Sequence, residues 1–274
     1  LTDRDLSGEK QFWFSDLGAL EYKGREGLIP TYALEGKTEV KEIFFKGSFV
    51  GREKELSKLR KYLESLDNGR NGGVIYIDGE AGSGKSRLTN HIRLEYEKNR
   101  TRQPVKWFYF SCDDIIREPY NPFKYFFNRY FDLEDDAEEQ NTEKFDQKFK
   151  AILERTESKK QKSVLESRRD YIAYFLKLKV NDPSILLEEP NERQNSVAMA
   201  ITDFFRTFTE RSALVFEIDN GSSIDQDSLK LISRIAGALK RSPFAVIFNC
   251  RFKDNGEAYD YSFSKQKRIK LNKF

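Results

Sequence analysis

Four short apolar runs divide the chain and predict the strands of a buried sheet. They are VIYID (74–78), VKWFYFSC (105–112), ALVFEID (213–219) and FAVIFNC (244–250). Each run is rich in Val, Ile, Phe or Tyr and is apolar on both faces, which is typical of a parallel strand that is covered on both sides. We expect a fifth strand to begin within KRIKLNKF (267–274).

Helical periodicity fills the intervals between these runs. Apolar residues recur at every third or fourth position on three stripes, formed by Leu56, Leu59, Leu63 and Leu66, by Val197, Ile201, Phe204 and Phe208, and by Leu229, Ile232, Ala236 and Leu239. Strands that alternate with helices predict a doubly wound α/β fold with a parallel sheet and right-handed crossovers.

The segment 113–200 carries no strand signal, and we predict that it is a helical insertion. An aromatic group lies at helical spacing near its start, made up of Phe123, Phe126, Phe127, Tyr130 and Phe131. We interpret these rings as core rather than as a stacking platform for bases, because no basic groove accompanies them. The charged residues that follow predict a solvated, mobile stretch around 132–165.

Composition limits the class of protein. The chain has 274 residues, of which 38% are apolar and 23 are Phe, so it can bury a large core. A net charge of +3 disfavours nucleic acid as a partner.

The two cysteines, Cys112 and Cys250, lie in apolar runs and predict buried free thiols in a reducing, cytoplasmic compartment. No run approaches the roughly 18 apolar residues of a membrane span, and no signal peptide is visible. Since the first residue is Leu, we expect a piece of a longer protein.

The octapeptide GEAGSGKS (79–86) follows the first apolar run and fits the pattern G-x-x-x-x-G-K-[ST]. Glycines let such a loop turn its backbone N–H groups toward a phosphate, and the helix that follows directs its positive end at the same anion. Lys85 would reach the β- and γ-phosphates, and the Ser86 hydroxyl would ligate Mg²⁺. A coincidental glycine-rich turn is the alternative. The residues predicted to bind ATP are Gly79, Glu80, Ala81, Gly82, Ser83, Gly84, Lys85, Ser86 and Arg87.

An acidic residue at the end of a neighbouring strand should complete the site. Asp219 ends the run 213–219 and is expected to hold Mg²⁺ or its waters. Hydrolytic P-loop enzymes usually have a second acid next, but this chain has Asn220, which cannot take a proton from water. Glu217 shares a sheet face with Asp219 but lies deeper, so a structural acid is favoured over a catalytic one.

The fourth apolar run ends in FNCR and supplies two further candidates. In P-loop proteins with this type of sheet, the strand that corresponds to 244–250 usually lies between the strand before the P-loop and the strand that carries the metal-binding acid. Asn249 could there face the γ-phosphate or the attacking water, and Arg251 could approach phosphate charge. A role as ordinary loop residues is an equal alternative for both.

A second motif, FVGREKELSKLRKYL (49–63), precedes the phosphate-binding loop (P-loop) at 79–86. The pair resembles the AAA+-like STAND NTPases, in which a VGRE box lies against the adenine and ribose. The resemblance covers about 49–274 and implies that Phe49, Val50, Gly51 and Arg52 line the base pocket. Where many relatives carry a His-Trp or Gln-Trp pair, this chain has GSS at 221–223, and the STAND winged-helix region is missing.

The first 36 residues resemble the end of a class III nucleotide cyclase domain, on the motifs YKG (22–24) and IPTYAL (29–34). The pattern alone predicts a β-hairpin with KGREG (23–27) as its turn. The implied organisation is a cyclase end at 1–36, a linker at 37–48 and a P-loop domain at 49–274. None of the cyclase's metal-binding aspartates is found here, so we expect no cyclase activity from this piece.

The leading interpretation is an ATP-binding regulatory module, a slow ATPase or nucleotide-gated switch, of a signalling protein like the soluble adenylyl cyclases. The expected ligands are ATP or ADP with Mg²⁺, although the pattern does not separate adenine from guanine. The expected partners are its own cyclase domain and missing C-terminal domains, with a homo-oligomer left open. Two alternatives remain, a DNA-binding AAA+ ATPase of the origin-recognition type and a structural domain with a vestigial nucleotide site.

Overall fold

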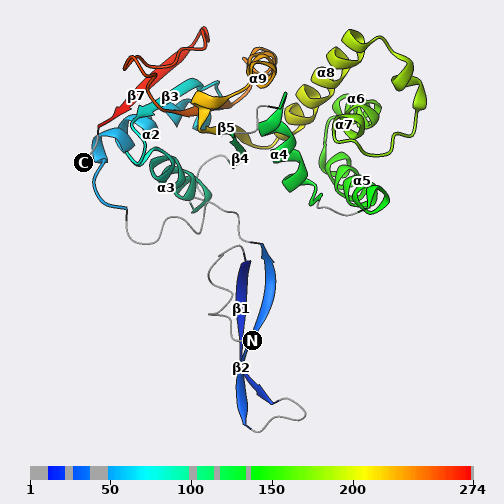
Figure 1. Ribbon diagram of the computed structural model, residues 1–274, viewed down its shortest axis with the longest axis horizontal. Coiled ribbons are helices and arrows are strands. Elements are labelled where there is room, and N and C mark those ends of the chain that lie inside the picture. Colours follow the sequence, from blue (N-terminus) through cyan, green and yellow to red (C-terminus); the bar gives the residue numbers. More distant parts are fainter. Residues whose placement is uncertain are drawn as a thin grey trace. The chain divides into compact units, whose positions relative to one another are not determined.

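The computed structural model consists of two compact units, Leu1–Gly51 and Arg52–Phe274 (Figure 1). The residues that it describes are 12–21, 27–37, 49–98, 104–113, 118–133 and 137–272.

The N-terminal unit contains an antiparallel hairpin of β1 (Phe12–Glu21) and β2 (Leu28–Lys37). The register pairs Glu21 with Leu28 beside the turn and Phe12 with Lys37 at the far end. The predicted hairpin is therefore confirmed. Most of its turn, and the predicted linker after Lys37, lie outside the described residues.

A five-stranded parallel sheet forms the centre of the second unit. Its strands lie in the order β4-β5-β6-β3-β7. Their bounds are β3 (Gly73–Gly79), β4 (Val105–Ser111), β5 (Ala213–Asp219), β6 (Phe244–Cys250) and β7 (Gln266–Leu271). All five predicted strands are present, and β6 separates the P-loop strand β3 from β5, as expected. The predicted α/β fold with a parallel sheet, flanking helices and a helical insertion is confirmed.

Helices cover both faces of this sheet (Figure 1). On one face lie α2 (Glu53–Asp67) and α3 (Lys85–Lys98). The other face is covered by α4 (Asn121–Tyr130), α8 (Pro190–Phe208) and α9 (Gln226–Ala238). The four leucines of the first predicted stripe are all buried in α2. No helix in the described part of the chain has the length and apolarity that crossing a bilayer requires.

The second and third predicted stripes are correct in part. In α8, Phe208 is only half-buried near the end of the helix. In α9, Leu229 and Ala236 are half-buried, because the helix contacts α4, α8 and β6 together and turns a different face to them. The buried residues of α9 are Ser228, Leu231, Ile232 and Ile235.

The predicted aromatic core is confirmed. The phenylalanines of the group are buried and Tyr130 is half-buried. The rings of Phe110 and Phe126 lie 4.8 Å apart, and those of Phe205 and Phe216 lie 4.6 Å apart. Such tilted contacts are the favoured geometry of aromatic pairs, so α4 and α8 are fixed to β4 and β5 by ring packing. Cys112 and Cys250 are buried free thiols, and burial raises the pKa of Cys250 to about 12.

The prediction of a solvated, mobile stretch around 132–165 is wrong for the part that the structure describes. Two helices occupy it, α5 (Glu138–Arg155) and α6 (Lys159–Ser167). Phe145, Phe149 and Ile152 are buried on one face of α5, and the charged residues lie on the other. The high charge therefore reflects an amphipathic helix rather than an unfolded segment. The insertion continues with α7 (Arg169–Phe175) and the 3₁₀ helix η2 (Pro183–Leu187).

This packing predicts that Phe145 is important for stability. Its fully buried ring lies 4.7 Å from Phe131 and 5.3 Å from Phe149. Phe145→Ala should lower the free energy of unfolding by about 3–5 kcal/mol, because it leaves a cavity where the helix is docked. The exposed Lys150 on the same helix provides the control, and Lys150→Ala should change stability by less than about 0.5 kcal/mol. Urea denaturation measures both, and equal, small effects would show that α5 is not docked.

Candidate nucleotide-binding site

The loop from Gly79 to Ser86 connects the buried strand β3 to α3. Gly82 and Gly84 have φ values of 75° and 91°, in the left-handed region that favours glycine. At Gly79 the constraint is space, because a Cβ atom there would lie 2.5 Å from Ser83 Oγ and 2.8 Å from the carbonyl oxygen of Leu271. The glycines of the motif are thus required by the shape of the loop.

Lys85 places its ammonium group against the backbone of this loop. Its Nζ donates hydrogen bonds to the carbonyl oxygens of Gly79, at 2.8 Å, and Glu80, at 2.9 Å. Burial and then the nearby charge of Arg251 lower the pKa of Lys85. Desolvation and a second cation both disfavour the charged form of a lysine, so an anion that binds beside it stabilises that charged form.

Ser86 and Asp219, the two predicted metal ligands, are in direct contact. Ser86 Oγ donates a hydrogen bond to Asp219 Oδ1 at 2.7 Å. The same carboxylate accepts from Asn249 Nδ2 at 3.1 Å and from the hydroxyl of Tyr109 at 3.0 Å. Burial and the charge of Asp219 raise the pKa of Tyr109, which keeps this hydroxyl a donor. The arrangement fixes Asp219 beside the first turn of α3.

Glu217 lies below this contact and is fully buried. It accepts hydrogen bonds from Thr89 Oγ1 at 2.6 Å and from Trp107 Nε1 at 2.7 Å. Asn249, also fully buried, donates to it at 3.3 Å. Glu217 is therefore a buried, hydrogen-bonded acid, and its predicted structural role stays a prediction. Thr89, Trp107 and Tyr109 were not predicted from the sequence; the alternation of Trp107 and Tyr109 along β4, which places both on one face of the sheet, was the available signal.

Asn220 and Arg251 differ in their surroundings. Asn220 has a φ of 52°, and its Nδ2 donates to the carbonyl oxygen of Cys112 at 3.3 Å. Its side-chain amide is thus directed at the end of β4. Arg251 is exposed just after β6, and its charge acts on Lys85. The structure therefore brings Arg251 near the phosphate loop, while its predicted contact with phosphate stays a prediction.

Arg52 contacts the phosphate loop, although its predicted contact with the base remains untested. It stands at the start of α2, and its guanidinium donates to the carbonyl oxygen of Ser83 at 3.3 Å and to that of Asn272. An ion pair with Glu55 at 3.4 Å also orients it. Phe49, Val50 and Gly51 belong to the N-terminal unit, so their predicted role stays a prediction.

The remaining loop residues predicted to bind nucleotide differ in exposure. Glu80 and Ala81 are exposed, and Arg87 is half-buried in the first turn of α3. Ser83 is almost completely buried, and its Oγ has no hydrogen-bond partner among the described residues. An unpaired buried hydroxyl close to the loop backbone is one of the features that a bound polar ligand would satisfy.

A partly buried ion pair at the end of β3, which the sequence patterns did not predict, stabilises the strand that precedes the loop. Asp78, only 1% exposed, accepts a hydrogen bond from Arg268 Nη1 in β7 at 2.7 Å. The same guanidinium lies 4.4 Å from the centre of the Tyr76 ring and donates to the carbonyl oxygen of Tyr259. Burial raises the pKa of Asp78, although Arg268 opposes this effect. The pair ties the strand before the P-loop to its neighbour β7.

The donor set fits a magnesium ion that binds together with a nucleotide. No cluster of three or more His, Cys, Asp or Glu side chains suited to a metal occurs among the described residues. Mg²⁺ does not require one, because it retains waters and uses one or two protein oxygens together with substrate phosphates. Ser86 and Asp219, held together at 2.7 Å, supply such a pair.

Three comparisons relate the chain to known proteins. The family model for the AAA ATPase domain matches residues 48–247. A comparison with curated proteins finds no significant match. Among solved structures, the chain is similar to one in the structure of Drosophila ORC bound to DNA, with 14% identity and a TM-score of 0.42. That similarity covers 82% of this chain and 44% of the other, so this chain spans less than half of that protein. Because the family match covers more than half of the sequence and contains both Lys85 and Asp219, the chain belongs to the AAA ATPase domain family.

Proposed function

We propose that this chain is a regulatory module that binds ATP with Mg²⁺ and hydrolyses it slowly. The observation that carries the proposal is the contact between Ser86 and Asp219, which joins the P-loop helix to the acid of β5 at 2.7 Å. Membership of the AAA ATPase domain family supports nucleotide binding. The partly desolvated Lys85 supports a site for the β- and γ-phosphates.

Each residue has a defined role in this proposal. The backbone N–H groups of the loop and the start of α3 bind the phosphates, and Lys85 offsets their charge. Ser86 and Asp219 hold Mg²⁺, which when bound neutralises charge on the phosphates. Asn249, which donates to Asp219 at 3.1 Å, keeps the carboxylate oriented. Arg251 stands just outside, where it approaches the terminal phosphate.

The surroundings of Asp219 support slow hydrolysis. Activation of water needs a group that accepts its proton. Asn220 stands where a second acid is usual and has no basic atom at neutral pH. Glu217 is fully buried, with Thr89 and Trp107 as hydrogen-bond donors, so water has no access to it. Neither Glu217 in β5 nor Asn220 just after it therefore fits the role of general base.

The parent protein in this proposal is a nucleotide cyclase fused to a STAND-type ATPase. The motifs at 22–24 and 29–34 support it, as does the hairpin of β1 and β2 in the N-terminal unit. In such a protein, the free energy of nucleotide binding would bias the assembly of the surrounding domains. ATP hydrolysis would then reset a switch rather than drive rapid turnover.

Removal of Lys85 tests the phosphate site. Lys85→Ala should abolish measurable ATP·Mg²⁺ binding, because the charge that faces the phosphates is lost, while the protein remains folded. The matched control is Lys58→Ala on the exposed side of α2, which should bind ATP like the unmodified protein. Isothermal titration calorimetry measures both, with circular dichroism to confirm folding. Undiminished affinity in a folded Lys85→Ala protein would refute the proposed site.

Introduction of an acid at residue 220 tests the slow chemistry. Asn220→Asp keeps the side-chain shape, and Asp also tolerates the left-handed backbone found here. The variant should raise the rate of phosphate release at least about tenfold without tightening ATP binding, since general-base catalysis contributes about 10²–10⁴-fold. A steady-state phosphate-release assay measures the rate. Rapid turnover by the unmodified chain that Glu217→Gln abolishes would contradict the assignment and identify Glu217 as the base.

A further inference from the structure

The helical insertion contains a pocket of about 760 Å³, and none of its lining residues belongs to the nucleotide site. Residues of α4, the start of α5, the end of α7, η2 and the first half of α8 line it. The helices α5, α7 and α8 lie on the right of Figure 1. The volume of the pocket lies within the range of about 300–1,000 Å³ that is usual for small-molecule sites. The insertion is therefore large enough to hold a ligand of its own.

The floor of this pocket is apolar. Val197 of α8 and Leu178, just after α7, are buried at 7% and 8% exposure. Aromatic side chains form the walls, with the rings of Tyr120 and Phe175 packed edge to face at 5.8 Å. Tyr174 is held by Arg193, whose guanidinium lies 5.0 Å from the ring centre. These surfaces fit the apolar body of a ligand.

The rim is predominantly basic. Four cationic side chains line the pocket, Lys124, Lys177, Lys179 and Arg193, against a single carboxylate, Glu138. Lys124 is paired with Glu118 at 3.3 Å, and Arg193 donates to the carbonyl oxygen of Leu186 at 2.7 Å.

Two of these cations are available to a ligand. Lys177 and Lys179 are exposed, and within the described residues neither ammonium group has a hydrogen bond or an ion pair. They stand two positions apart at one edge of an apolar pocket, and this combination is complementary to an anion with an apolar body.

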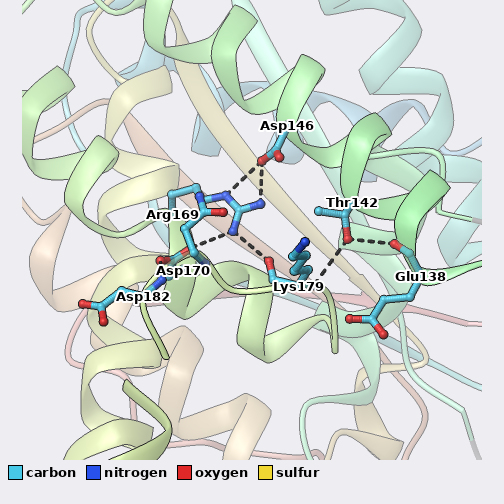
Figure 2. Close-up of polar contacts among 8 residues, drawn as sticks. Glu138, Thr142, Asp146, Arg169, Asp170, Lys179 and Asp182 are labelled. Carbon is cyan, nitrogen blue, oxygen red and sulfur yellow. Dashed lines mark hydrogen bonds and ion pairs between the residues drawn. The ribbon is translucent and has the colours of Figure 1, made fainter. Parts of the chain in front are cut away.

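The backbone around Lys179 is fixed in advance by a buried arginine (Figure 2). Arg169 donates to the carbonyl oxygen of Lys179 at 2.8 Å, and the amide of Lys179 donates to Thr142 Oγ1 at 3.3 Å. Two carboxylates hold this guanidinium, Asp146 at 2.7 Å and Asp170 at 2.6 Å. Asp170 also accepts the amides of residues 181 and 182. The segment that carries Lys179 is thus preorganised, which lowers the entropic cost of binding.

Lys177 occupies a backbone position that ordinarily favours glycine. Its φ is 57°, and it follows the end of α7 in a Schellman motif. In this motif the amide of Lys177 donates to the carbonyl oxygen of Tyr174, and the amide of Leu178 donates to that of Ala173. A residue with a Cβ atom has a higher conformational energy in the left-handed region than glycine has. The left-handed backbone therefore costs stability at this helix end, while the positive charge interacts favourably with the last carbonyl groups of α7. The position of that charge at the pocket provides a second reason for the lysine.

We propose that this pocket binds a small amphipathic carboxylate, with the anion beside Lys177 and Lys179 and the aliphatic or aromatic body between the apolar walls. The size of the pocket, its apolar floor and its two available ammonium groups carry the proposal. The pocket is separate from the nucleotide site, since the two share no residue.

Competition between matched ligands tests the chemistry. The protein is titrated with the fluorescent anion 1-anilinonaphthalene-8-sulfonate, which is then displaced with octanoate or with 1-octanol. Octanoate should displace the probe at a concentration at least about tenfold lower than octanol, because only the carboxylate can pair with the lysines. Equal displacement by both, or by neither, would overturn the proposal.

Paired charge reversals locate the site. Lys177→Glu with Lys179→Glu should weaken octanoate at least about tenfold. Lys150→Glu with Lys162→Glu makes the same change of charge at exposed positions of the insertion outside this pocket, and should change affinity by less than about twofold. Equal losses in the two double variants would show that only the overall charge matters, and would contradict the assignment.

A glycine at residue 177 separates binding from stability. Lys177→Gly should raise Tm by about 1–2 °C, because relaxation of the left-handed backbone outweighs the lost attraction between the exposed lysine and the C-terminus of α7. It should also weaken octanoate by about threefold, because one ammonium group is lost. A purely structural lysine would instead leave octanoate binding unchanged, and that result would refute its role in the site.

Discussion

The hydrogen bond from Ser86 to Asp219 is the contact on which the nucleotide site depends. Ser86 lies at the start of α3 and Asp219 at the end of β5, and β6 separates their two strands in the sheet. With β6 between β3 and β5, the carboxyl ends of all three parallel strands lie at one edge of the sheet, and the two oxygens come within 2.7 Å. The sheet therefore positions the two groups of the proposed chemistry.

Buried polar groups underneath keep this contact in place. Glu217 is fully buried, which would be costly if its carboxyl oxygens lacked partners. Thr89, Trp107 and Asn249 supply donors, and Asn249 also donates to Asp219. One amide thus ties the structural acid to the proposed metal ligand. A network in which each member fixes another gives a rigid site, and removing one partner would leave the rest unsatisfied.

Local patterns predicted the features that depend on neighbouring residues. Apart from the motif residues Ser86 and Asp219, they did not predict which distant residues contact one another. The strands, the leucine stripe of α2 and the loop from Gly79 to Ser86 are encoded within short segments, and the structure contains them. The bonds from Trp107 to Glu217, from Arg268 to Asp78 and from Arg52 to the loop join residues far apart in the chain. The segment that forms α5 was predicted to be solvated and mobile because it contains many acids and lysines. The helical spacing of its apolar residues was the better indicator.

Sequence patterns also did not predict which non-glycine residues adopt a positive φ angle, or what such residues do. Lys177 ends α7 where glycine is usual, and its significance appears only when the pocket beside it is known. The same holds for Asn220, whose left-handed backbone turns the chain just after Asp219. In both cases the residue type was visible, but the backbone that gives it meaning was not.

A double-mutant cycle on Ser86 and Asp219 tests the central claim most directly. ATP affinity is measured by calorimetry for the unmodified chain, Ser86→Ala, Asp219→Asn and the double variant, with Mg²⁺ and with EDTA. If the two side chains hold one metal ion, the double variant loses about as much affinity in Mg²⁺ as the more damaging single variant, and the losses largely disappear in EDTA. Losses that add independently, or that are the same without Mg²⁺, would contradict the account.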